Sequence, residues 1–331
     1  MRQVVLSSGT KAWAFGSSQY VQAAVANVEI EIAKQGKYTL PTKAMQPIQN
    51  NYRPETDISL ALNDNNGSIY QSMIGVLRRI VELGRVNICC KVSMMLSHLA
   101  LPRQGHLQQL HHMFVYLKRF HNAEMVFDPT YPVIDKSMFD RKDWTTSEFG
   151  LSLDEELPIN IPESRGFGFL MQSFVNADHA TDSITRKSCT GFLVYLNSAL
   201  IYWMSKKQTS VETSSFGSEF CAMKQCTEYI HGLCYKLRMM GIPIDGPCYI
   251  YGDNKSVLYN STMPDSTLNK KLQSIAYHFV REGAACGKWR TAYVNTHDNP
   301  SNLLTKPMSN GAKRIGFVQM ILHHIFGTAL D

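Results

Sequence analysis

The sequence has no long apolar run and no regularly spaced cysteines. Its eight cysteines include no C-x-x-C pair, which disfavours a zinc site and a disulfide framework. Cys221, Cys226 and Cys234 fall within an apolar pattern of helical spacing, so we expect reduced core thiols. The first residues lack an apolar segment of secretory length, and no run approaches a membrane span. We therefore expect an intracellular protein, cytoplasmic or nuclear, that is not secreted.

Strong charge of either sign is also missing. The chain has 33 Lys and Arg against 27 Asp and Glu, which gives a net charge of +6 and a pI near 8.8. A balance this mild is compatible with a polyanionic partner but does not indicate one by itself. The length of 331 residues is sufficient for two domains and a sizeable core.

The hydrophobic period changes once along the chain, which predicts two regions. In residues 1–125 apolar residues recur at helical spacing in several segments, and we interpret this region as a small helical bundle. Residues 126–165 are irregular and contain prolines, and we interpret them as a linker. Residues 166–331 show a mixed α/β pattern.

The second region is predicted to form a mixed sheet flanked by helices. GFLMQSFV, TGFLVYL and ALIYWMS are β-rich runs joined by short turns, which indicates an antiparallel meander. A long helix is expected from Ser215 to Met240. The strand PCYIYGD, two helices, the strand KWRTAYVNT and a final helix from about Asn302 to Phe326 follow. The predicted order is β-β-β-α-β-α-α-β-α.

Four positions in four of these elements are predicted to converge. Asn176 ends the first strand, Asp253 ends PCYIYGD, Glu219 lies near the start of the long helix, and Asn302 begins the last helix. Ligands collect at the carboxyl ends of strands in an open α/β sheet. Two Mg²⁺ ions at such a place would require several carboxylate oxygens.

Ordered blocks of sequence carry a family resemblance. In the second region they are NADHATDSITRKSCTGF, SEFCAMKQCTEYIHG, IYGDNKSVL, AYHFVRE and NLLTKPM. These blocks resemble the ribonuclease H domain of copia-type retrotransposon reverse transcriptases, and residues 70–118 resemble the region that follows the polymerase active site. The resemblance implies a ribonuclease H-like α/β fold preceded by a helical thumb- and connection-like region. It also implies Mg²⁺-dependent hydrolysis of RNA in RNA–DNA hybrids.

The resemblance assigns the family's four acidic metal ligands to Asn176, Glu219, Asp253 and Asn302, and two of these are amides here. An amide keeps an oxygen but loses a charge. A unit-charge pair at about 4 Å is worth roughly 4 kcal/mol at an effective dielectric constant of 20. We therefore expect Glu219 and Asp253 to be the remaining metal ligands, Mg²⁺ binding to be weak or absent, and hydrolysis to be impaired.

Three neighbours are candidates for a share in catalysis. Asp178 follows Asn176 by two residues, and Asp298 precedes Asn302 by one helical turn, so either is a candidate for replacing a lost ligand. The resemblance also implies a role for His297, in the loop before the last helix, in proton transfer or product release.

Paired basic residues suggest a nucleic-acid contact. They form either a solvated face or a contact with the sugar-phosphate backbone of an RNA–DNA hybrid. The resemblance favours the second interpretation for Lys206 and Lys207, and we name Arg186 and Lys187 as further candidates. The pairs are Arg186 with Lys187, Lys206 with Lys207, and Lys270 with Lys271.

No Asp-Asp dipeptide occurs in the chain, so the family's polymerase site is missing. We expect the carboxyl-terminal part of a larger polyprotein, with the upstream polymerase part as a candidate partner. Three hypotheses stay open: a decayed fragment with little nuclease activity, a working ribonuclease H in which neighbours replace the lost ligands, and a non-catalytic nucleic-acid-binding or structural module.

Overall fold

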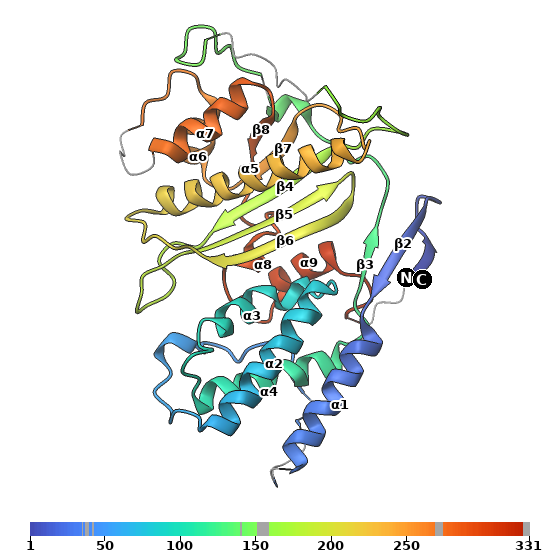
Figure 1. Ribbon diagram of the computed structural model, residues 1–331, viewed down its shortest axis with the longest axis vertical. Helices are drawn as coiled ribbons and strands as arrows, with labels where there is room; N and C mark the ends of the chain where they lie inside the picture. Colours follow the sequence, from blue (N-terminus) through green and yellow to red (C-terminus); the bar gives the residue numbers. More distant parts are fainter. Residues whose placement is uncertain are drawn as a thin grey trace.

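A five-stranded mixed sheet forms the centre of the molecule (Figure 1). The computed structural model describes residues 1–34, 36, 40–41, 43–139, 141–150, 159–268 and 274–326. The strand order is β6-β5-β4-β7-β8; β4 is antiparallel to β5 and parallel to β7. β5 is antiparallel to β6, and β7 is parallel to β8. The strands are β4 (Met171–Ala177), β5 (Cys189–Leu196), β6 (Ala199–Lys207), β7 (Cys248–Gly252) and β8 (Trp289–Tyr293).

This sheet confirms the predicted mixed α/β class and the ribonuclease H-like arrangement of strands. The first three strands are an antiparallel meander, and PCYIYGD supplies β7 beside β4. One face is covered by α5 (Ser215–Met239), α6 (Lys255–Thr262) and α7 (Ser274–Ala285). Phe192 and Phe220 are buried in the core between them.

The prediction of a single final helix from Asn302 to Phe326 is wrong. The segment contains a single turn, α8 (Asn302–Thr305), and a separate helix, α9 (Ala312–Ile321). Pro307 explains the break, because proline lacks an N–H and disfavours helical backbone in the residue before it. Lys306 is accordingly extended, with φ −141° and ψ 150°. Both helices lie on the sheet face opposite α5 (Figure 1).

The helical region packs against the face of the five-stranded sheet that lies opposite α5, and the two share one hydrophobic core. Leu77 and Phe114 belong to the same buried cluster as Leu193 of β5 and Leu304 of α8. Among the described residues no helix is long and apolar enough to cross a membrane.

The proposed domain boundaries at residues 125 and 165 stay a prediction. The helices are α1 (Ser18–Lys34), α2 (Asp64–Glu82), α3 (Cys89–Leu96) and α4 (Gln104–Arg119).

A second, antiparallel sheet was not predicted from the sequence. It consists of β1 (Arg2–Val5), β2 (Lys11–Gly16) and β3 (Glu124–Phe127), in that order. β2 pairs with β3, which follows it by more than 100 residues. This pairing links the start of the chain to the segment that leads into the five-stranded region.

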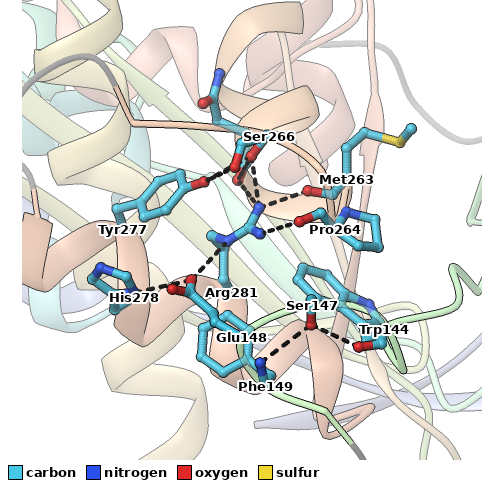
Figure 2. Close-up of polar contacts among 11 residues, drawn as sticks. Trp144, Ser147, Glu148, Phe149, Met263, Pro264, Ser266, Tyr277, His278 and Arg281 are labelled. Carbon is cyan, nitrogen blue, oxygen red and sulfur yellow. Dashed lines mark hydrogen bonds and ion pairs between the residues drawn. The ribbon is translucent and has the colours of Figure 1, made fainter.

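Arg281 attaches the segment after β3 to α7 (Figure 2). Its guanidinium donates to the Met263 carbonyl over 2.6 Å and lies 4.9 Å from the centroid of the Trp144 ring. Glu148 Oε1 lies 3.2 Å from His278 Nδ1 and 3.9 Å from Arg281 Nε. The motif AYHFVRE therefore has a packing function in this chain.

Candidate active site

The structure brings Asn176 and Asn302 into direct contact. Asn176 is the next-to-last residue of strand β4, and Asn302 begins α8. Asn176 Nδ2 donates to Asn302 Oδ1 over 2.9 Å and to Thr305 Oγ1 over 3.3 Å. Asn176 is 2% exposed and Asn302 is fully buried. Two predicted ligand positions are thus joined by a hydrogen bond between their amides.

Two backbone carbonyls fix the orientation of the Asn302 amide. Asn302 Nδ2 donates to the carbonyls of Thr296 and Asn299, each over 2.9 Å. Asn299 Nδ2 in turn donates to the Val175 carbonyl over 3.0 Å and holds this loop against β4. An aspartate has no donor in its ionised form, so at position 302 it would direct an oxygen toward carbonyl oxygens. The amide at position 302 is therefore part of the packing of the loop.

Glu219 and Asp253 form an acidic pair at the same end of the sheet. Glu219 Oε2 accepts the Ala177 N–H over 2.8 Å. Burial raises the pKa of Glu219 well above the usual range of a glutamate, and the nearby charge of Asp253 raises it further. Asp253 directly follows β7. The four predicted positions therefore lie together, and Glu219 faces β4 rather than solvent.

Gly191 allows α8 to approach the sheet closely. It lies opposite Asn176 in the pairing of β4 with β5. A Cβ at this position would come within 2.7 Å of Leu304 Cβ and 2.8 Å of Thr305 Cγ2, closer than carbon atoms pack. The glycine of the TGF motif therefore positions Asn302 beside β4.

These residues do not fit a centre for two Mg²⁺ ions. The Asn302 oxygen already accepts a hydrogen bond, and its nitrogen is directed at carbonyls. Within the described ranges, no three His, Cys, Asp or Glu residues are grouped so that they could hold a metal ion. Glu219 and Asp253 supply two carboxylates, whereas Mg²⁺ ions prefer several oxygen ligands each.

The three other catalytic candidates lie in different environments. Asp178 is 8% exposed, and its carboxylate accepts the Cys189 N–H. Burial raises the pKa of Asp178 although this hydrogen bond opposes the shift. His297 and Asp298 are exposed in the loop before α8. Catalytic roles for Asp178, His297 and Asp298 stay predictions.

The predicted nucleic-acid contacts separate into two groups. Arg186 and Lys206 are exposed on the surface. Lys187 and Lys207 line a cavity that also contains Asp178. The pair Lys270 and Lys271 lies outside the described residues.

Sequence reasoning did not single out Thr305, Asn299 or Thr296, although all three contact the two amides. A signal for Thr305 was present, because it follows Asn302 by three residues in NLLTKPM, and that spacing places two side chains on one face of a helical turn. The backbone carbonyls that hold Asn302 have no equivalent signal in the sequence.

The chain is similar to parts of retrotransposon polyproteins. No protein-family model matches it. The retrovirus-related Pol polyprotein from transposon RE2 of Arabidopsis thaliana is 31% identical over 161 residues, which are 47% of this chain and 11% of that protein. The polyprotein from transposon RE1 of the same plant is 32% identical over 161 residues, with the same shares of 47% and 11%. The chain thus spans about a tenth of the length of the curated relatives it matches.

Among solved structures, ribonuclease H1 from the archaeon Halobacterium salinarum NRC-1 aligns with 41% of this chain and 93% of its own length. The sequence identity is 11% and the TM-score 0.32. The strand order and the four converging positions define a ribonuclease H-like region. The matches to the two polyproteins confirm the resemblance of this region to the ribonuclease H region of copia-type retrotransposon Pol polyproteins.

Proposed function

We propose that this chain is a fragment of a copia-type Pol polyprotein whose ribonuclease H-like region binds an RNA–DNA hybrid but hydrolyses its RNA strand poorly. The hydrogen bond between Asn176 and Asn302 carries the proposal, since it occupies two positions where the resemblance implies carboxylates. The proposal includes weak or absent binding of Mg²⁺.

The charge of the site supports weak hydrolysis. Glu219 and Asp253 together supply a charge of −2 at most, half of what two divalent cations carry. Each missing charge is worth roughly 4 kcal/mol of attraction per unit-charge pair at about 4 Å, at an effective dielectric constant of 20. The hydrogen bonds from Asn302 Nδ2 to two carbonyls add a second obstacle, because the amide must break them before it can turn.

Binding of the hybrid relies on a different set of groups. Arg186 and Lys206 are exposed beside the meander and available to phosphates. Because such contacts release counterions, affinity for the hybrid should fall as salt is raised. An upstream polymerase part of the polyprotein is a candidate partner, and an intracellular location is part of the same proposal.

An assay on a labelled RNA–DNA hybrid, with and without Mg²⁺, tests the proposal. We expect salt-sensitive binding and little cleavage by the unaltered protein. The control is Glu219→Gln, which removes one of the two remaining acids and should leave binding unchanged. Brisk Mg²⁺-dependent cleavage that Glu219→Gln abolishes would show that Asp178 or Asp298 has replaced a lost ligand, and would overturn the proposal.

A further inference from the structure

Lys91 is a buried cation that the described part of the chain does not pair with an anion. It lies in α3 and is 1% exposed. Its Nζ has no hydrogen-bond partner among the described residues. The groups that interact with it electrostatically are Cys89 and Cys90, beside it in the chain, and Arg314, which is itself a cation. A buried charge without a counter-charge is costly, so its retention points to an anion.

Lys91 lines a cavity of about 210 Å³ between the helical region and the ribonuclease H-like region. One wall is the segment 46–55 together with α3. The other consists of the turn between β4 and β5, the end of β6, and residues 305–309. Asp178 and Thr305 line the same cavity, so it adjoins the candidate active site.

The other charges in the cavity are largely compensated. Lys207 Nζ lies 2.6 Å from Asp182, whose pKa burial would raise but which Lys207 and the Thr185 amide hold at about 2. Arg53 lies 3.7 Å from Glu55. Asp178 accepts a backbone N–H.

Two cations remain in the cavity without a carboxylate partner in the described part of the chain, Lys91 and Lys187. They come from opposite walls. Burial lowers the pKa of Lys91 to about 8, so the side chain is still mainly protonated at neutral pH.

We propose that this cavity binds a phosphate group between Lys91 and Lys187. The phosphate has two sources: inorganic phosphate, or the backbone of a polynucleotide strand that runs past the candidate active site. The second source rests on the proposed function, whereas the first does not. Lys91 would then give the helical region a direct part in ligand binding.

The test is a comparison of thermal unfolding in phosphate and in chloride at matched ionic strength. We expect phosphate to raise the unfolding temperature of the unaltered protein more than that of Lys91→Met, and to bind the variant at least tenfold more weakly. Lys118→Met serves as the matched control, because Lys118 lies on the surface in an ion pair with Glu29, and it should respond like the unaltered protein. The general stabilising effect of phosphate is shared by all variants and cancels.

Lys187→Met provides a second variant on the opposite wall, and it too should weaken the phosphate response. A short single-stranded oligothymidylate and its uncharged methylphosphonate analogue separate the two sources. If Lys91→Met weakens the response to the charged strand but not the response to inorganic phosphate, the backbone of a polynucleotide is the source of the phosphate. If it weakens only the response to inorganic phosphate, the free ion is the ligand. Equal responses of both variants and the unaltered protein to every probe would overturn the inference. None of these measurements depends on cleavage, so a failure of the proposed function is recognised separately.

Discussion

Asn176 Nδ2 donates to Asn302 Oδ1 over 2.9 Å and thereby joins β4 to α8 at the end of the sheet. Both residues are buried. The resemblance implies an acid at each of these positions, yet two ionised carboxylates at this distance would repel each other unless cations lay between them. Where the resemblance implies two carboxylates, the chain has two neutral amides, and their hydrogen bond stabilises the loop before α8.

Asn302→Asp should destabilise the protein by about 3 kcal/mol in the absence of divalent cations, because it removes two hydrogen bonds to carbonyls and buries a charge. The measurement is urea unfolding at neutral pH. Asn65→Asp, at an exposed position in the first turn of α2, should change stability by less than about 0.5 kcal/mol. Equal stability of Asn302→Asp and the unaltered protein would contradict the structural role of the amide.

Asn176→Asp and Asn302→Asp together should strengthen Mg²⁺ binding and recover cleavage of the hybrid, while either change alone should recover little. The two side chains are in contact, and both restored carboxylates would be needed to hold the same pair of metal ions. The effects of the two substitutions should therefore be strongly non-additive. Calorimetric titration with Mg²⁺ and single-turnover cleavage provide the measurements. A double variant that is folded and binds the hybrid but still does not cleave it would support a purely binding or structural function.

Lys91→Met should stabilise the protein at pH 7 in chloride, by up to about 3 kcal/mol, because the folded-state pKa of about 8 lies below the ordinary value of 10.5. Below pH 8 Lys91 is protonated in both the folded and the unfolded protein, so the burial of its charge lowers the free energy of unfolding by the full amount. Between pH 8 and 10.5 the unfolded state binds more protons, so the stability of the unaltered protein rises with pH.

The advantage of Lys91→Met should therefore shrink as pH rises from 8 to 10.5. Burial raises the pKa of Cys89 to about 12 and that of Cys90 as well, so both thiols stay largely neutral in this range in the folded protein. Urea unfolding at a series of pH values gives the difference between the two proteins. A difference that does not change between pH 8 and 10.5 would show that burial leaves the pKa of Lys91 at its ordinary value, and would contradict this prediction.

Gly191→Ala should destabilise the protein by about 1 to 3 kcal/mol, because the added Cβ would overlap Leu304 and Thr305. Gly232 offers a matched control: it lies inside α5, and a Cβ there would meet nothing within 4 Å. Gly232→Ala should instead stabilise by up to about 1 kcal/mol. If thermal unfolding shows the same change for both variants, α8 does not approach the sheet as described.

Arg281→Met should cost about 3 kcal/mol or more, because the guanidinium donates to several acceptors between residues 260 and 266 and contacts Trp144 (Figure 2). Arg79→Met is the control, since Arg79 is exposed and forms an ion pair with Glu82, and it should change stability little. Comparable urea midpoints for the two variants would argue against a packing role for the AYHFVRE motif.

Local pattern determined much of the ribonuclease H-like region. The meander, β7 and β8 have strong apolar runs of the strand period, and α5 has a long apolar stripe, so their type and order were predictable from the sequence. Because strand ends are points where ligands collect, the approach of Asn176, Glu219, Asp253 and Asn302 was predictable as well.

Tertiary structure decided what those positions do. The partners of the Asn302 amide are backbone carbonyls of Thr296 and Asn299, and a carbonyl has no identity in the sequence. The small sheet of β1, β2 and β3 depends on pairing across more than 100 residues, and strands of four to six residues carry little signal of their own. Lys91 is unremarkable in the sequence. Only the packing of α3 against residues far along the chain removes its ammonium group from water, with no counter-charge beside it in the described part of the chain.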